Sequence, residues 1–369
     1  MKKARLIGID ILKIVCALLI FGRHAVRMGG CHFYLHNYLL DDLIVGMTSI
    51  VMSIFFIVSG FTMQYVYGER KILENRNSLV QYYAKRIIAL LPMYMFVHIV
   101  SSFFYGNSLG DAVRLFPVEI LGIQTWYNTL FGFLHNGGTW FVSCLLVAYF
   151  IYPLVSQLLS GLHIKWKLFI LVGLICMKIY SSYILFYYKL TDIYTSPLFR
   201  TIEFIIGVVL CSVVSFNEIK KYKWIDLILF FLSSIILFKG RSIFVGQWSG
   251  VNYLFISILI YSASRLNGVQ TYYKNRIING ILKIINYLVE LNYPFYILQC
   301  ILWKPFYALL SRYTFLEENS RRCLLAFGIL FFATIILHEI YEKPVKKLLG
   351  NMINRKEKNY LYHNERKDK

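Results

Sequence analysis

Long apolar runs recur along the whole chain of 369 residues, and charged residues gather in the short connections between them. Hydrophobic residues make up 58% of the sequence and charged residues only 16%, whereas soluble domains carry roughly one charged residue in four. Most runs approach the roughly 20 residues that a helix needs to cross the hydrocarbon core of a membrane. The sequence therefore predicts an all-α, polytopic membrane protein, because helices satisfy their own backbone hydrogen bonds in lipid.

We expect one helical bundle of about ten transmembrane helices. They are predicted near residues 7–27, 43–66, 87–105, 139–160, 168–187, 198–216, 225–245, 250–264, 284–310 and 322–341. Lys and Arg residues concentrate in every second connection, and such an excess marks the cytosolic side. This alternation places both termini in the cytosol. It also accounts for the net charge of +20 without a nucleic-acid partner.

Two segments do not fit the pattern of spans. Residues 106–138 form a long external connection rich in Leu, Ile, Phe and Trp, which favours a re-entrant or interfacial segment packed against the bundle, with a partial eleventh span as the alternative. Residues 346–369 are charged and lack an apolar face, so they are predicted to be a disordered cytosolic tail that follows a membrane domain of residues 1–345. The cysteines have no paired spacing, and neither a disulfide nor a metal site is expected.

The first predicted span, residues 7–27, contains four residues that are costly to place in lipid: Asp10, Lys13, Arg23 and His24. Lys13 and His24 are eleven positions apart, which places them within about 20° on one helix face and about 16 Å apart along the axis. Asp10 shares this face and can neutralise Lys13 three residues later. His24 can exchange a proton near neutral pH, as a general base must. The structural alternative is that the charged residues mark the helix ends, with His24 hydrogen-bonded among the headgroups.

The next two spans also contain candidate residues with two interpretations each. Ser59 and Gly60 interrupt an aromatic run, where small residues allow close approach of either a helix or a substrate. Lys85 and Arg86 precede the third apolar run, where they serve either as a positive-inside anchor or as a grip on the phosphates of a cytosolic cofactor.

Seven short motifs follow one another in order along the chain. They are the spacing from Lys13 to His24, FFIVSGF, KRIIALLPMY, TWFVSCLLVAYFIYPLV, LFRTIEFIIGVVL with Arg200 and Glu203, LNYPFYILQ with Tyr293, and YEKPVKKLL with Glu342 and Pro344. The series covers nearly the whole chain and resembles the membrane-bound acyltransferase-3 family. Members of that family O-acylate sugars of exopolysaccharide, capsule, lipopolysaccharide or peptidoglycan.

The resemblance implies a set of site residues. His24 would be catalytic, Lys13, Arg86 and Lys85 would bind the acyl donor, and Asp10, Ser59, Trp140 and Glu342 would support them. The site is expected in a cleft between the first four spans, walled by aromatics such as Trp140 and Tyr149. Three positions depart from the family pattern: Ala89 stands where a second Arg is usual, no acid follows Trp140, and Gln299 stands where many relatives have His.

The resemblance also implies the reaction and its partners. The protein is expected to move an acyl group, acetyl in the first instance with succinyl left open, from cytosolic acetyl-CoA to a hydroxyl of a cell-surface or exported glycan. Acetyl-CoA would be a co-substrate, with no permanently bound cofactor, and the acceptor a glycan or lipid-linked saccharide. His24 would act as a base or as a transient acyl carrier.

The expected location is the plasma membrane of a bacterium. A homo-oligomer or a complex with polysaccharide-synthesis machinery is left open. The rival functions are a polysaccharide exporter, in which the same charges would line a path, and a structural subunit of such machinery.

Overall fold

The computed structural model describes residues 5–35, 38–105, 109–126, 137–188, 194–214, 223–266, 276–310 and 319–353. Within these ranges the protein is helical apart from a small hairpin of two strands, β1 (Tyr34–Leu35) and β2 (Tyr38–Leu39). The strands are antiparallel, and Tyr34 pairs with Leu39. The expected all-α architecture is therefore correct but for this hairpin.

The helices follow one another along the chain with short connections. They are α1 (Ile7–Gly29), α2 (Asp41–Gly46), α3 (Thr48–Tyr67), α4 (Arg76–Tyr105), α5 (Leu109–Ile120), α7 (Trp140–Ser160), α8 (Ile164–Tyr187), α9 (Pro197–Val213), α10 (Lys223–Ile243), α11 (Asn252–Arg265), α12 (Arg276–Leu310) and α13 (Asn319–Leu337). Short 3-10 segments are η1 (Ile72–Glu74), η2 (Gly137–Thr139) and η3 (Gly246–Val251), and the π-helix η5 (His338–Glu342) continues from α13.

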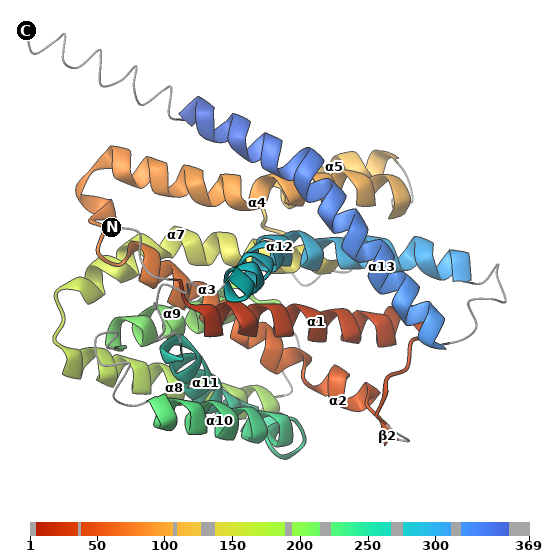
Figure 1. Ribbon diagram of the computed structural model, residues 1–369. Coiled ribbons are helices and arrows are strands. Elements are labelled where there is room, and N and C mark those ends of the chain that lie inside the picture. The colour runs from red at the N-terminus through yellow and green to blue at the C-terminus, as the bar shows by residue number, and fades with distance from the viewer. Residues whose placement is uncertain are drawn as a thin grey trace, which may run out of the picture.

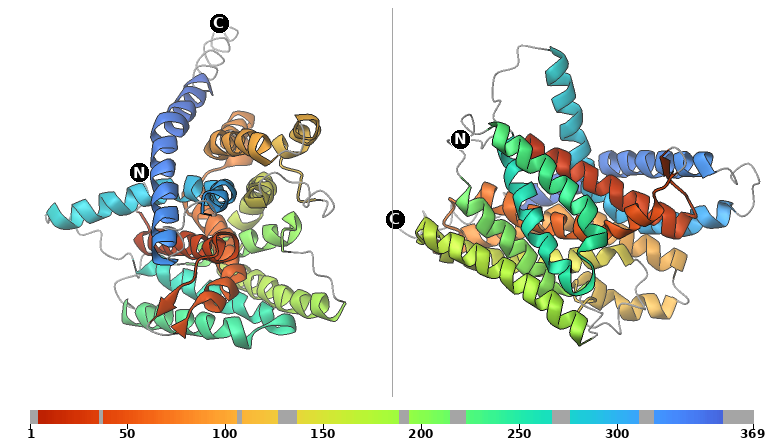
Figure 2. Two further views of the ribbon diagram at one scale, coloured as in Figure 1. Left: turned by 90° about the vertical axis from the view of Figure 1, so that its right-hand side faces the viewer. Right: turned by 90° about the horizontal axis from the view of Figure 1, so that it is seen from below.

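The long helices form a bundle in which most axes run roughly side by side, while α13 crosses the others obliquely (Figure 1). Helix α1 begins and α13 ends toward the same side, at the left of Figure 1. Seen end-on, α1 lies at mid-height of the bundle, with α4 and α5 above it and α8 and α10 below it (Figure 2).

Five helical segments in the described part of the chain are long and apolar enough to cross a membrane: Asp41–Tyr67, Arg76–Ser102, Trp140–Ser160, Ile164–Tyr187 and Arg321–Ile353. Each coincides with a span expected from the sequence. The other five expected spans are also helices, but α9 has only 17 residues and α11 only 14. Helix α1 carries Asp10, Lys13 and Arg23 within its length. The protein is therefore a helical membrane protein, and the total of about ten spans stays a prediction, as does the cytosolic position of both termini.

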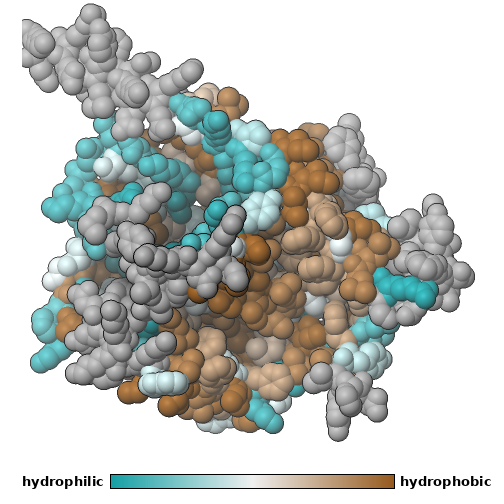
Figure 3. Space-filling view, viewed as in Figure 1, coloured by the Kyte–Doolittle hydropathy of each residue, from teal (hydrophilic) through white to brown (hydrophobic). Residues whose placement is uncertain are grey.

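The surface has the apolar character that a lipid environment requires. Phe150, Phe169 and Ile340 are each at least 70% exposed, and many other large apolar side chains face outward. Figure 3 shows a broad hydrophobic area across the middle of one face, with hydrophilic residues toward its edges. An apolar area of this extent fits contact with acyl chains.

Helices α3 and α9 make the closest helix contact near the centre of the bundle. A Cβ atom on Gly60 would lie 1.9 Å from the carbonyl oxygen of Phe204, and one on Gly207 would lie 1.8 Å from that of Ile57. Only glycine permits backbones to approach so closely. The structure therefore favours the packing interpretation for Gly60.

The end of α5 and the segment after it pack into the bundle. Glu119 is buried and forms an ion pair with His98 of α4, and Gln124 donates to the hydroxyl of Tyr94, at 3.2 Å. Thr125 shares a hydrogen bond of 2.7 Å with Ser143 of α7. The expected packing of the external segment against the bundle thus holds for residues 119–125, while residues 106–108 and 127–136 lie outside the described residues.

The C-terminal helix is longer than the sequence predicts. The chain is helical up to Ile353, which corrects the expectation of disorder for residues 346–353. Two ion pairs with i,i+4 spacing support this extension: Lys343 with Glu339 and Lys346 with Glu342, both at 2.6 Å. Residues 354–369, the rest of the expected tail, lie outside the described residues.

Candidate active site

A cavity of about 240 Å³ lies among α1, α3, α4, α7, α12 and η5, and we call it the inner cavity. Lys13, Ser59 and Glu342, three residues expected at the site, line it together with Tyr149. The wall also contains Tyr293 and several apolar side chains of α3, α7 and α12. The expected cleft between the first four spans is therefore present, but α12 and η5 complete it.

Charged groups gather at one end of the inner cavity. Glu342 is fully buried, and its carboxylate contacts His338 at 2.5 Å and the ammonium group of Lys346 at 2.6 Å. Lys346 lines the cavity as well, as does Glu290. Glu342 thus holds a second cation, Lys346, in the cavity that Lys13 lines. Glu290 and Glu342 match the two ammonium groups in number, and the ammonium groups are the atoms there that can bind a phosphate.

Asp10 has a different partner from the one expected. The structure pairs its buried carboxylate with Arg5, and Lys13 forms no ion pair within 4 Å among the described residues. Arg5 precedes the helix, and its side chain extends along the first turn to Asp10. The i,i+3 and i,i+4 spacing rules apply only to pairs within a helix, so they do not predict this contact. The expected mutual neutralisation of Asp10 and Lys13 therefore does not take the form of a direct ion pair.

Arg86 lies behind the wall of the inner cavity. Its guanidinium donates to the hydroxyl of Tyr67 at 3.0 Å and lies 6.0 Å from the ring centre of Tyr149, which lines the cavity. Lys85 instead lines a separate pocket of about 110 Å³ with Tyr67 and Arg70. The structure therefore does not bring Lys85 and Arg86 into the cavity that Lys13 lines. Of the two, Arg86 lies against the cavity wall, through Tyr149.

Ala89, which stands where the family motif has a second Arg, lines the inner cavity and contributes no charge there. Lys346 supplies a cation in the same cavity, although it lies in the segment that the sequence assigns to the tail. Lys346 is surrounded by other basic residues in the sequence, and no local pattern distinguishes it from the rest of the tail.

His24 is buried between α1 and α12, and its Nδ1 atom lies 2.8 Å from Oε1 of Gln299. An amide oxygen in this position accepts a hydrogen bond from Nδ1–H, which leaves the lone pair of the neutral His24 ring on Nε2. In the sequence Gln299 indicates only the loss of a second proton carrier, whereas the structure makes it the residue that orients His24.

His24 does not line the inner cavity but lies beyond one end of it. Asn292 of α12 lines the cavity, and Gln299 follows it by two helical turns on about the same face. On α1, His24 follows Lys13 by three turns, also on one face. Along both helices the chain therefore runs from a residue that lines the cavity to a member of the pair of His24 and Gln299.

Trp140 belongs to a different part of the bundle. Its ring packs against Phe56 and Tyr194, and the guanidinium of Arg200 lies 5.4 Å from the ring centre. Phe141, the next residue, lines the inner cavity instead. The expectation that Trp140 walls the same cleft as Lys13 is wrong, because successive helical residues point about 100° apart.

These features describe a helical membrane protein with a cavity lined by lysines, glutamates and tyrosines, and with a buried histidine farther along the helix that carries Lys13. The sequence model of the acyltransferase-3 family, described as an acyltransferase domain, matches residues 6–338. The chain therefore belongs to the acyltransferase-3 family, as its motifs indicated. No curated protein and no solved structure was found to match it.

Proposed function

We propose that the protein transfers an acetyl group from cytosolic acetyl-CoA to a hydroxyl of an exported or cell-surface glycan, in the plasma membrane of a bacterium. Membership of the family supports acyl transfer in a membrane. The donor, the acceptor and the O-acetyl specificity are the proposed part. Orientation follows the predicted topology, in which the charged end of the inner cavity faces the cytosol.

The arrangement of Lys13 and Lys346 relative to His24 supports this proposal most directly. Both lysines line the inner cavity, and α1 and α12 lead from it to His24 and Gln299. A donor with anionic phosphates at one end and a reactive acyl group on a long arm at the other suits such a path. In acetyl-CoA these two ends are joined by the pantetheine chain.

The reaction then needs a base where the acceptor hydroxyl meets the thioester. Nε2 of His24 takes the proton of the hydroxyl, and the alkoxide oxygen attacks the thioester carbonyl. The C–S bond breaks, and the CoA thiolate leaves with a proton returned by His24. In the alternative order Nε2 first accepts the acyl group itself and then passes it to the hydroxyl. Gln299 orients the imidazole in both cases.

The decisive experiment follows labelled acetyl groups with purified protein in nanodiscs. We expect transfer from labelled acetyl-CoA to a glycan acceptor by the unchanged protein, and loss of that transfer in His24→Ala and His24→Gln. His163→Ala is the matched control, because His163 is exposed at the start of α8. Transfer that persists without His24 would refute its assignment.

Three readouts separate the remaining interpretations. Label that stays on the protein without acceptor, and disappears in His24→Ala, would identify a covalent acyl carrier. Glycan that crosses the membrane without any label transfer would support an exporter instead. A strain that lacks the protein should show fewer acyl groups on its surface glycan, and the acyl group lost distinguishes acetyl from succinyl.

A further inference from the structure

A second and larger cavity, of about 490 Å³, lies among α3, α8, α9, α10, η3 and α11, and we call it the outer cavity. Helix α3 separates it from the inner cavity: Ser53 lines the outer cavity and Ser59 the inner one. Six residues turn a helix by about 600°, so these serines point about 120° apart. The two cavities therefore lie on different faces of α3.

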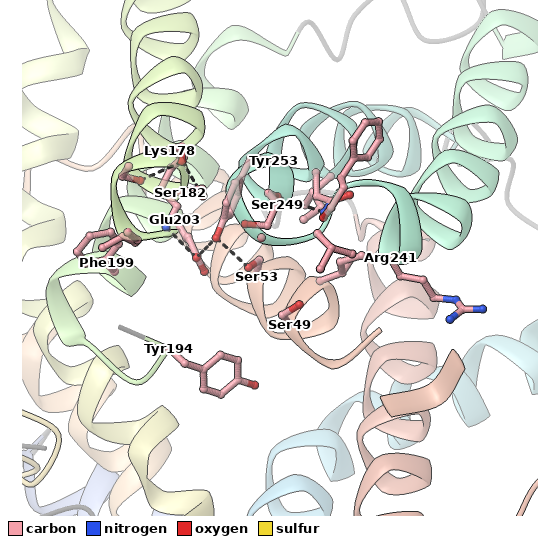
Figure 4. Close-up of a pocket in the computed structure, with 18 of the residues that line it drawn as sticks. Ser49, Ser53, Lys178, Ser182, Tyr194, Phe199, Glu203, Arg241, Ser249 and Tyr253 are labelled. Carbon is pink, nitrogen blue, oxygen red and sulfur yellow. Dashed lines mark hydrogen bonds and ion pairs between the residues drawn. The ribbon is translucent and has the colours of Figure 1, made fainter. Parts of the chain in front are cut away.

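The base of the outer cavity is a buried cluster of charges. Glu203 accepts hydrogen bonds from Arg200 at 2.8 Å, from Lys178 at 3.2 Å and from the hydroxyl of Tyr253 at 2.6 Å. Figure 4 shows Lys178, Glu203, Tyr253 and Ser53 gathered together. Two cations thus share one carboxylate, and burial of an excess charge is costly unless a further partner neutralises it.

The rim adds a third cation and unsatisfied polar atoms. Arg241 of α10 lines the cavity, and its buried Nε atom has no hydrogen-bond partner among the described residues. Oδ1 of Asn252, another lining residue, also lacks one within the described part of the chain. Ser49 and Ser249 lie between the charged cluster and Arg241 in Figure 4. Buried polar atoms are nearly always satisfied, so these atoms point to a polar ligand.

The cavity has both the size and the wall of a saccharide site. Its volume lies within the range of small-molecule pockets, about 300 to 1,000 Å³. Tyr194, Phe199 and Phe244 provide aromatic surface, and hydroxyl groups of several serines provide hydrogen bonds. Three cations against one carboxylate favour an anionic ligand over a neutral one.

The position of the outer cavity relates it to His24. Ser49 near the start of α3, Arg200 near the start of α9 and Arg241 near the end of α10 all belong to helix ends on the predicted external side. Tyr194 lines the cavity and lies outside the spans. Burial raises the pKa of its hydroxyl, while the charges of Arg200, in the cavity, and of Arg23, in α1, lower it. Arg23 is the neighbour of His24, so Tyr194 in the wall of the outer cavity lies within electrostatic reach of the predicted external end of α1.

We propose that the outer cavity binds an acidic sugar unit of the acceptor glycan, one that bears a carboxylate or a phosphate. This inference rests on the proposed acyl transfer to a glycan. Arg241 meets the anion at the rim, and the cluster around Glu203 supplies positive charge at the base. The donor and the acceptor would therefore enter from opposite sides of α3.

The test measures binding without acetyl-CoA, so that it does not depend on acyl transfer. Protein in nanodiscs is titrated with a glucuronic acid oligomer, with glucose 1-phosphate and with a neutral glucose oligomer. The variant is Arg241→Gln, which leaves the buried cluster intact. Lys239→Gln is the matched control, because it removes an exposed cation from the same helix outside the cavity lining.

We expect at least one acidic probe to bind more tightly than the neutral oligomer. Arg241→Gln should weaken that binding about tenfold, which corresponds to about 1.4 kcal/mol, and Lys239→Gln should leave it unchanged. The probe that binds distinguishes a carboxylate from a phosphate. Equal binding of acidic and neutral probes, no binding of any probe, or equal effects of the two substitutions would overturn the inference.

Failure of this inference and failure of the proposed function give different results. If acidic probes bind as expected while no acetyl transfer occurs with any acceptor, the function is wrong and the binding site stands. If transfer depends on His24 while Arg241→Gln changes neither acceptor KM nor probe binding, the function stands and the acceptor site is elsewhere.

Discussion

Replacement of Gly207 by Ala should strongly destabilise the bundle. The added methyl group would lie 1.8 Å from the carbonyl oxygen of Ile57 and 2.8 Å from the amide nitrogen of Phe61, whereas ordinary van der Waals contact begins at 3.4 Å. Helices α3 and α9 would have to separate by about 1.6 Å, because backbone atoms cannot turn away as a side chain can. Overpacking costs about 1 to 3 kcal/mol, and we expect the upper end of this range.

The assay is thermal unfolding of the purified protein in detergent. Gly173→Ala in the interior of α8 is the matched control, because nothing lies within 4 Å of the position of its Cβ atom. We expect Gly207→Ala to lower Tm by several degrees and Gly173→Ala to leave it unchanged or slightly higher, since alanine is the better helix former.

The same substitution should also weaken acyl transfer, because α3 and α9 carry residues of both cavities, such as Ser59 and Arg200. Wild-type Tm and wild-type activity in Gly207→Ala would show that α3 and α9 do not touch through their glycines. A loss of Tm of the same size in Gly173→Ala would show that the effect is not specific to this contact.

Three single substitutions test contacts around the inner cavity. Gln299→Ala removes the hydrogen-bond acceptor for Nδ1 of His24, the proposed base, and should lower kcat about 10- to 100-fold with little change in donor KM. Gln299→Glu should restore part of the rate, and an unchanged kcat in Gln299→Ala would contradict this. Tyr67→Phe removes the hydrogen bond to Arg86 and should raise the KM for acetyl-CoA about tenfold, so an equal KM would show that Arg86 does not act on the donor. Lys346→Gln should raise the same KM, and the exposed neighbour Lys347 provides the control, whose replacement by Gln should have no effect.

The positions of the helices, and the face of α1 that carries Lys13 and His24, could be predicted from the sequence. Apolar runs of sufficient length gave the positions of the five helical segments in the described part of the chain that are long and apolar enough to cross a membrane, because length and hydropathy are local properties. The helical period placed Lys13 and His24 on one face of α1. In the structure Lys13 lines the inner cavity and His24 contacts Gln299 of α12, so both point toward the same neighbouring helix.

The partners of these residues could not be predicted, since they come from distant segments. Gln299 lies 275 positions after its partner His24 in the sequence, and the ion pair between Lys178 and Glu203 joins α8 to α9. Such contacts depend on how helices pack, which no local pattern encodes. The tail prediction failed for a related reason: Lys346 is charged like its neighbours, but packing of Glu342 inside the bundle extends the helix and brings Lys346 to the cavity.

The glycine contact between α3 and α9 also limits how the protein can move. Two backbones in direct contact cannot slide past each other without losing that contact, so α3 and α9 should behave as one rigid unit. Helix α3 forms a wall of both cavities, and this unit is therefore the fixed frame of the bundle. Any opening that lets a substrate in or a product out must come from the helices on its flanks, α1 with α12 on one side and α8, α10 and α11 on the other.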